Sequence, residues 1–152
     1  MAEREVCMKI HHEATFACAP SALFEWLAEP EKAKAWMKTV LQTEITKSTD
    51  EKVGTTFTEV VGDGKGQIHM TGTITAYIEN KLIAFHLESR VNQLDVEYTI
   101  DEIDTGTRLS IDSTIHWKFP INIASVFMGN KIRAGVIAQL RDELSELEKL
   151  CG

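Results

Sequence analysis

The sequence is poor in cysteine, and its few cysteines follow no metal-binding spacing. Cys7, Cys18 and Cys151 are an odd number, and no CxxC pair occurs. Such a set is neither the framework of a small disulfide-rich domain nor a typical zinc site. We therefore expect reduced, structural thiols, with a redox or disulfide role as the alternative.

The sequence also lacks long apolar runs and an excess of positive charge. The N-terminal stretch MAEREVCMKIHHEA has no apolar core of signal-peptide length, and the other apolar runs are far shorter than the ~20 residues of a membrane-spanning helix. A net charge of −7 at pH 7 repels a phosphate backbone, and no stripe of Lys and Arg overrides it. We expect a cytoplasmic protein with no membrane span and no nucleic-acid partner.

The apolar content is nevertheless sufficient for one sizeable core. The chain has 152 residues, of which 43% are hydrophobic and 26% are charged. A domain of this length buries roughly 70% of the surface that its unfolded chain exposes. Because no linker-like segment, charge block or internal repeat divides the chain, residues 1–152 are predicted to form a single domain.

Two short helices are predicted near the N-terminus of a chain that is otherwise strand-like until its last part. Residues 8–16 alternate between apolar and polar side chains, which predicts a half-buried strand. The stretch APSALFEWLAEPEKAKAW follows at 19–36. Pro20 and Pro30 can each occupy the first position of a helix, and apolar residues recur at helical spacing behind each proline.

The rest of the chain predicts an antiparallel meander followed by a long helix. Turn signals such as GDGKG and DTG separate six segments rich in Thr, Ile, Val and aromatic residues, at 41–47, 53–61, 67–78, 82–89, 92–102 and 107–118. From about 122 to 150 the apolar period becomes helical, with a stripe of Ile132, Val136, Leu140, Leu144 and Leu147. This stripe and the apolar face of the sheet are expected to cover each other.

Four of these strands have a clear apolar face because their residues alternate. The face carries Ile68, Met70, Ile74 and Ile78, then Ile83, Phe85 and Leu87, then Leu94, Val96, Tyr98 and Ile100, then Leu109, Ile111, Ile115 and Trp117. The opposite face is largely polar, which is typical of strands that face water. The strand at 53–61 is ambiguous, and its face stays unassigned.

Several residues stand at positions typical of one protein superfamily. They are Pro20, Phe24, Leu27, Pro30 and Trp36 in the helix pair, Gly54 in KVGTTF, Gly72 in MTGTIT and Leu82 in ENKLIAF. Together with the order of elements, they resemble the START-like, birch-pollen-allergen-like helix-grip superfamily (SRPBCC). Within it the chain is most similar to the bacterial polyketide cyclase/dehydrase and lipid-transport group. Asn80 and Lys81 replace a proline that many relatives have before Leu82, a departure that affects only a turn.

The resemblance implies an α+β helix-grip fold. In that superfamily a curved seven-stranded antiparallel sheet surrounds a long C-terminal helix, the two short helices close one end, and a cavity commonly lies between sheet and helix. Gly129 and Gly135 in the long helix each cost about 1 kcal/mol relative to Ala. Their presence suggests a need for room or for a bend, and the alternatives are tight packing against a strand or a frayed first turn.

No metal site or cofactor is predicted from the residue spacing. His11 and His12 are adjacent in a strand and must point to opposite faces, and no HxH or HExxH spacing occurs. His12 shares the inner face, where it is either a core histidine satisfied by a hydrogen bond or a polar anchor in a pocket. Asp95 and Glu97 lie on the outer face, so surface ion pairing with Arg108 and Asp112 on a neighbouring strand is the simpler interpretation.

Three functions remain open from the sequence. The first is binding or carriage of a lipid-like or polycyclic molecule between sheet and helix, with His12, Met70, Phe85, Tyr98, Ser113, Trp117, Phe127 and Ile132 as candidate ligand-binding residues. The second is a cyclase or dehydratase with His12 and Tyr98 as acid and base. The third is a protein-interaction module, which some members of the superfamily imply and which an exposed apolar patch around Val126, Phe127 and Met128 would favour. The partner is thus expected to be a hydrophobic small molecule, and the protein a monomer or weak homodimer.

Overall fold

The computed structural model describes residues 7–62, 66–118 and 121–151, with side chains in the last range described from Gly129 onward. The elements are β1 (Cys7–Phe16), α1 (Pro20–Ala28), the 3₁₀ helix η1 (Pro30–Ala35), β2 (Val40–Lys47), β3 (Thr56–Gly62), β4 (Gln67–Ile78), β5 (Leu82–Glu88), β6 (Asn92–Ile103), β7 (Gly106–Trp117) and α2 (Ile121–Cys151).

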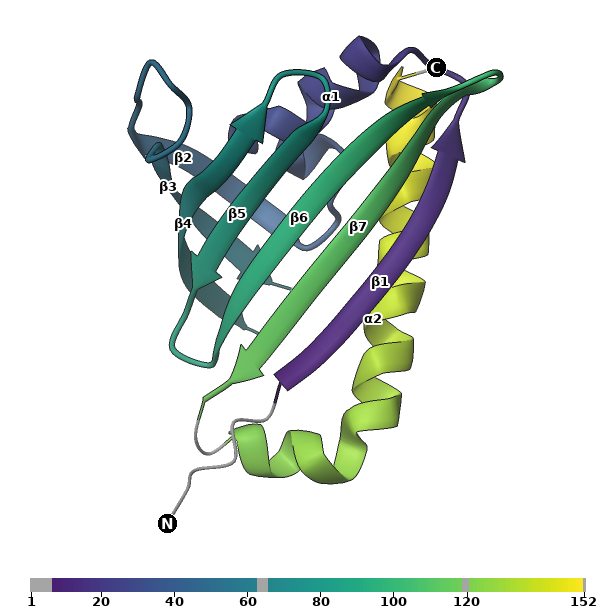
Figure 1. The fold of residues 1–152 in the computed structure, drawn as a ribbon. Coiled ribbons are helices and arrows are strands. Elements are labelled where there is room, and N and C mark those ends of the chain that lie inside the picture. The colour runs from purple at the N-terminus through teal and green to yellow at the C-terminus, as the bar shows by residue number, and fades with distance from the viewer. Residues whose placement is uncertain (1–6, 63–65, 119–120, 152) are drawn as a thin grey trace.

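One curved antiparallel sheet holds all the described strands. Its order is β1-β7-β6-β5-β4-β3-β2, so consecutive hairpins build the sheet and β1 pairs with the last strand of the meander. Figure 1 shows the sheet curving in front of α2, while α1 closes one end. The predicted α+β helix-grip architecture is confirmed, because each hairpin follows a turn signal and each long strand has one apolar face.

The helix pair is built around its two prolines. Pro20 begins α1, and Leu23, Phe24 and Leu27 form the buried stripe of that helix. Pro30 begins η1, which ends when Trp36 leaves helical geometry with its backbone N–H still donating to the Ala33 carbonyl. The second element is therefore a 3₁₀ helix, a form that suits short pieces of chain.

The core divides into two clusters along the inner face. The larger one packs α1 and the C-terminal part of α2 against the strands, and its fully buried members include Leu23, Ile83, Leu109 and Leu147. The smaller one joins Met8, Ile10 and Ile115 to partly buried residues of α2 and the strands, namely Leu94, Trp117, Ile132, Val136 and Ile137. Because α2 spans both clusters, burial of its apolar stripe stabilises the whole length of the sheet.

The assignment of Ile78 to the inner face is wrong. The pairing of β4 with β5 shifts between Ile74 and Ala76, so an extra residue reverses the direction of the side chains that follow. Tyr77 consequently packs inward, with its ring 5.5 Å from that of Phe24, and Ile78 is 55% exposed.

The expectation of reduced thiols is also wrong for two of the cysteines. Cys18 and Cys151 form a disulfide that links the start of α1 to the end of α2, with their Cα atoms 6.0 Å apart, while Cys7 is free and exposed. A second contact holds Cys18, which lies between β1 and α1: the buried Thr107 hydroxyl donates a 2.8 Å hydrogen bond to the Cys18 carbonyl. The disulfide was missed because 133 positions separate the two cysteines in sequence.

The two glycines of α2 do not mark tight packing. A Cβ atom placed on Gly129 or Gly135 would meet no described atom within 4 Å. Figure 1 shows α2 changing direction after its first turns and then running behind the sheet. A bend or a local need for space therefore fits these glycines better than a close strand contact.

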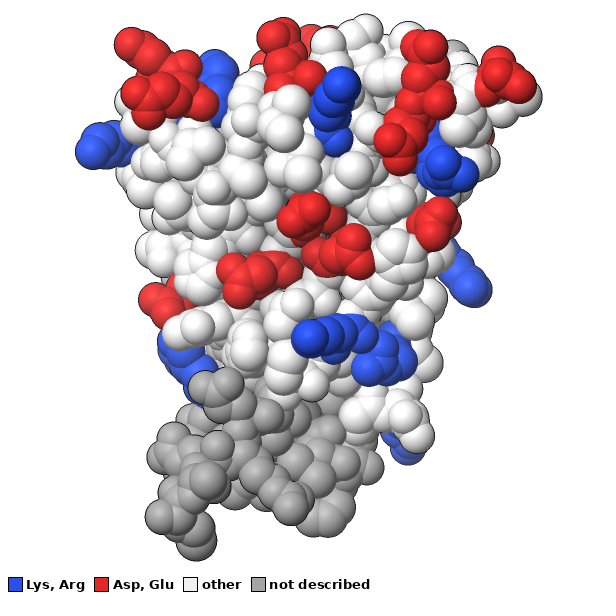
Figure 2. Space-filling view, viewed as in Figure 1, with Lys and Arg blue, Asp and Glu red and all other residues white. Residues whose placement is uncertain are grey.

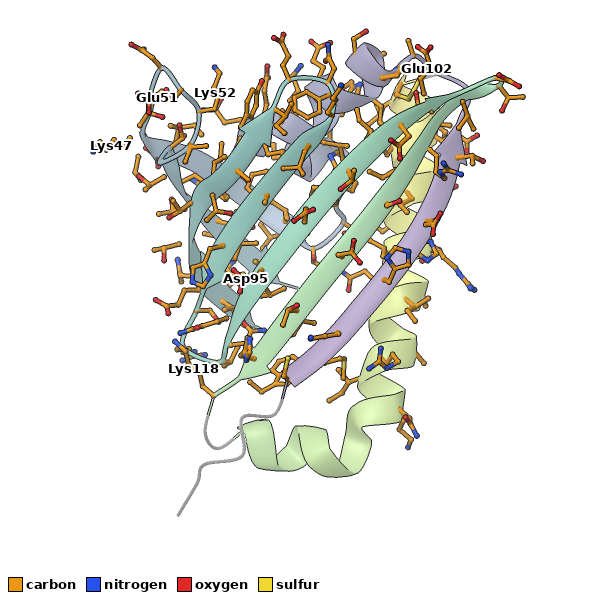
Figure 3. All side chains as sticks on the ribbon, in the orientation of Figure 1. Lys47, Glu51, Lys52, Asp95, Glu102 and Lys118 are labelled. Atoms are coloured by element: carbon orange, nitrogen blue, oxygen red, sulfur yellow. A yellow bond between two sulfur atoms is a disulfide. The ribbon has the colours of Figure 1, made fainter. Side chains whose placement is uncertain are left out.

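The outer face of the sheet is polar and rich in carboxylates. Figures 2 and 3 show this face, with Asp and Glu scattered over it and Asp95 projecting from β6. The predicted surface pairing takes a different form, because two of the predicted residues pair with histidines: Asp112 lies 2.6 Å from His11, and Asp95 lies 2.8 Å from His86. Within the described residues, no helix is long and apolar enough to cross a membrane.

Candidate functional site

An aromatic cavity of about 70 Å³ lies between the helix pair and the inner face of the sheet. Its lining comes from α1, η1 and strands β3, β5 and β6: Trp26, Leu27, Glu29, Pro30, Ala33, Trp36, Met37, Phe57, Glu59, Phe85, Leu87, Val96 and Tyr98. Apolar groups dominate this lining, while the carboxyl groups and the indole and phenol groups are its polar elements. Such a composition is typical of a small-molecule site.

The floor of the cavity is a row of aromatic rings from three strands. The ring centroids of Phe57 and Phe85 are 5.8 Å apart, and those of Phe85 and Tyr98 are 6.2 Å apart, both pairs in edge-to-face geometry. Gly72 creates the room for this row, because a Cβ atom there would lie 2.3 Å from the Phe57 ring. The glycine is thus required by the close approach of a side chain.

Trp36 brings an unused hydrogen-bond donor to the cavity. Its side chain is 3% exposed, yet its indole nitrogen Nε1 has no hydrogen-bond partner among the described residues. Most buried polar groups in native proteins are paired. Because Trp36 lines the cavity, its unpaired indole N–H is a candidate contact for a molecule that occupies it.

Glu59 brings a buried carboxyl group to the same cavity. It is 9% exposed on β3, two residues from Phe57 and therefore on the same inward face. Burial, reinforced by the charge of Glu143, raises the pKa of Glu59 from 4.5 to about 7. Glu59 was not predicted as a site residue, because the face of its strand was unassigned. Its two-residue spacing from Phe57, which places both side chains on one face, is the sequence signal that could have identified it.

Glu143 of α2 is a second buried carboxyl group, 6% exposed. It accepts hydrogen bonds from the Gln139 side chain and the Lys38 backbone, which favour its ionised form, but burial outweighs them and raises its pKa from 4.5 to about 7. Burial, together with the charges of Glu143 and Glu59, also raises the pKa of Tyr98. The three groups lie close enough to influence one another, so acidic groups with raised pKa values cluster at this end of the sheet.

The predicted site residues occupy more than one place. Phe85 and Tyr98 line the cavity, and Met70 is buried opposite Glu59 in the β3–β4 register. The others lie elsewhere: Ser113 is half-buried between Val96 and Ile10 in the sheet, Trp117 and Ile132 belong to the smaller cluster, and Phe127 falls outside the described side chains.

His12 lines a separate groove. This groove, of about 210 Å³, runs along the free edge of β1 beside Arg141, Ser145 and Glu148 of α2 and is more open to solvent than the cavity. In the sheet register Ile111 stands between His12 and Tyr98. The predicted acid–base pair therefore lines two different hollows. A third hollow of about 650 Å³, beside the β6–β7 turn, is broad and shallow.

No metal centre emerges from the described part of the chain. Within residues 7–62, 66–118 and 121–151, no group of three or more His, Cys, Asp or Glu residues is placed to hold a metal ion. The carboxyl groups of the cavity are accompanied by aromatic rings and by no described basic side chain.

Comparison with known families decides the relationship. Residues 8–152 match the family described as polyketide cyclase / dehydrase and lipid transport. The chain belongs to this family. Residues that carry the expected resemblance also build the cavity of this family member, since Leu27, Pro30 and Trp36 line it.

Solved structures place the same family member among START-like folds. TTHA0849 from Thermus thermophilus superposes with a TM-score of 0.79 at 14% identity, covering 95% of this chain and 97% of that one. A START superfamily protein from Mycobacterium smegmatis gives 0.75 at 14% identity, covering 95% and 96%. Ara h 8.0201 gives 0.71 at 13% identity, covering 94% and 96%. No curated protein sequence matches. At these identities the structures show the shared fold alone, while the family match confirms the predicted polyketide cyclase/dehydrase and lipid-transport group.

Proposed function

We propose that the protein binds an apolar small molecule in the aromatic cavity, as a carrier or binding protein. The observation that carries the proposal is the lining itself, in which aromatic and aliphatic side chains surround the few polar groups of Trp36, Glu59 and Tyr98. Membership of a family described by polyketide cyclisation and lipid transport supports an apolar ligand.

The size of the cavity restricts the occupant. A volume of about 70 Å³ is about half that of a ~150 Å³ protein cavity that holds benzene, so even one aromatic ring enters only if the wall adjusts. A polycyclic or lipid-like ligand would therefore place only one end inside, unless the wall opens. Met37 is the lining residue best suited to move, because its unbranched side chain is only partly buried and adapts its shape easily.

Ethylbenzene is a suitable probe, and its binding can be followed by ¹H–¹⁵N NMR titration. We expect saturable shifts at cavity residues in the native chain. Ala33→Leu fills the cavity and should abolish them, whereas Ala84→Leu, the same change on the outer-face side of β5, should not. Unchanged binding in a folded Ala33→Leu protein, or no saturable shifts in the native chain, would refute the proposal.

A second candidate function is acid–base catalysis on the bound molecule. It is favoured by the Glu59 carboxyl, whose pKa of about 7 suits proton transfer near neutral pH, and by Tyr98 in the same cavity. These residues replace the His12–Tyr98 pair in the enzyme hypothesis. If it holds, Glu59→Gln should eliminate turnover of a polyketide-like substrate while binding persists, and full turnover in that variant would exclude this role.

The remaining sequence predictions concern context. An interaction module was tied to Val126, Phe127 and Met128, whose side chains fall outside the described residues. The single domain, the cytoplasmic location and the monomer or weak homodimer all stay predictions. Size-exclusion chromatography with light scattering measures the last of these directly.

A further inference from the structure

Trp36 presents an unusual combination of burial and unmet hydrogen bonding. Its backbone is held at the end of η1, and its side chain is enclosed on the inner side of the sheet. The indole Nε1 nevertheless lacks a partner among the described residues. A buried donor without a partner is less stable than a solvated one, so an acceptor that reached this N–H would bind favourably.

Acceptors of the protein itself are present in the cavity but are not used. Glu59 and Tyr98 line the same walls, and neither is a partner of the Trp36 N–H. The other rings of the lining offer no strong acceptor, and Trp26 instead stacks beneath the ammonium group of Lys32 at 5.3 Å. The Trp36 donor is thus unused by the described residues, and Trp36 itself lines the cavity.

We propose that Trp36 determines the specificity of this cavity, and that its indole N–H selects ligands that carry a carbonyl-type oxygen next to an apolar group. The inference rests on the proposed function and adds a chemical class to it. Apolar contacts with the aromatic row supply affinity for any small apolar group, whereas the single directed donor distinguishes a ketone, aldehyde or ester from a hydrocarbon of the same shape.

The test compares acetophenone with ethylbenzene, which differ by one carbonyl group in place of a methylene. Moving the ketone oxygen out of water is unfavourable, so any apolar site favours ethylbenzene over acetophenone. The measured quantity is therefore the change in the affinity ratio of the two probes between the native chain and each variant. Trp36→Phe should shift this ratio against acetophenone by about tenfold, the effect of one lost hydrogen bond.

Trp117→Phe is the matched control. The indole nitrogen of Trp117 is also buried and without a hydrogen-bond partner among the described residues, but its side chain belongs to the smaller core cluster and does not line the cavity. We expect the ratio to stay within about twofold of the native value, below the effect of one hydrogen bond. In the native chain, the indole N–H resonance of Trp36 should move downfield with acetophenone and not with ethylbenzene, which tests the contact even if Trp36→Phe fails to fold.

The outcomes separate this inference from the proposed function. Equal ratios in the native protein and in folded Trp36→Phe, or an unaffected Trp36 indole resonance at saturating acetophenone, would overturn the role of Trp36 and leave apolar binding intact. Failure of both probes to bind would overturn the two proposals together. An affinity ratio that shifts in Trp36→Phe and is kept in Trp117→Phe supports the inference.

Discussion

Replacing Glu59 by glutamine should make the protein more stable at alkaline pH and remove part of its pH dependence. The substitution keeps the size of the side chain and abolishes its ionisation. The groups that face Glu59 are Glu143 from α2, Tyr98 from β6 and Glu29 from the segment before η1. None of these is basic, so ionised Glu59 gains no counter-charge from the cavity.

The sign follows from proton binding. The pKa of Glu59 is raised in the folded state from 4.5 to about 7, so between these values the folded state holds more protons than the unfolded state. The stabilising contribution is fully present below pH 4.5 and is lost as the pH rises through about 7. The difference between the two pKa values corresponds to a loss of about 3 kcal/mol in the free energy of unfolding.

Urea denaturation from about pH 4 to about pH 8.5 measures this loss in the native chain and in Glu59→Gln. The stability of the native chain should fall relative to the variant by up to about 3 kcal/mol across that range. Glu97→Gln, the same change at an exposed position, is the control. A stability difference between the native chain and Glu59→Gln that does not change with pH would refute the assignment of Glu59 as a buried carboxylic acid.

Three further predictions concern packing and covalent structure, and urea denaturation tests each. Gly72→Ala displaces the Phe57 ring and should lower the free energy of unfolding by about 1–3 kcal/mol. Gly66→Ala, with open space around it, should lower it by less than about 0.5 kcal/mol, and equal effects would contradict the packing. Cys18→Ser removes a cross-link between residues 133 positions apart and should lower the free energy of unfolding by up to about 5 kcal/mol under oxidising conditions. Cys7→Ser should leave stability unchanged, and identical stabilities of the two variants would exclude the disulfide. Leu147→Ala deletes a fully buried side chain and should cost about 2–5 kcal/mol, and a smaller loss would mean that α2 packs more loosely than described.

The fold was predictable because its signals are local and repeated. The long strands alternate over most of their length, several hairpins have a turn signal, and the change to a helical period near residue 122 marks α2. The wrong assignment of Ile78 shows that alternation alone cannot predict faces beyond a bulge. The bulge inserts one residue into β4 and reverses the faces that follow, and no residue type in that stretch indicates it.

The site was only partly predictable, because it depends on contacts between distant segments. Phe85 and Tyr98 were found through their alternation in the sheet. Glu59 was missed since both faces of its strand carry β-branched residues, and the unpaired N–H of Trp36 depends on how η1 packs against the strands. The pairing of Cys18 with Cys151 likewise depends on where the two ends of the fold meet.

Native mass spectrometry of freshly purified protein tests the central claim most directly, with the native chain and Ala33→Leu measured side by side. The account predicts a small-molecule adduct on the native chain that disappears on denaturation and is absent from the cavity-filled variant. An identical adduct on both proteins, or an unliganded native chain that also fails to show saturable shifts with ethylbenzene, would contradict a ligand site in the aromatic cavity.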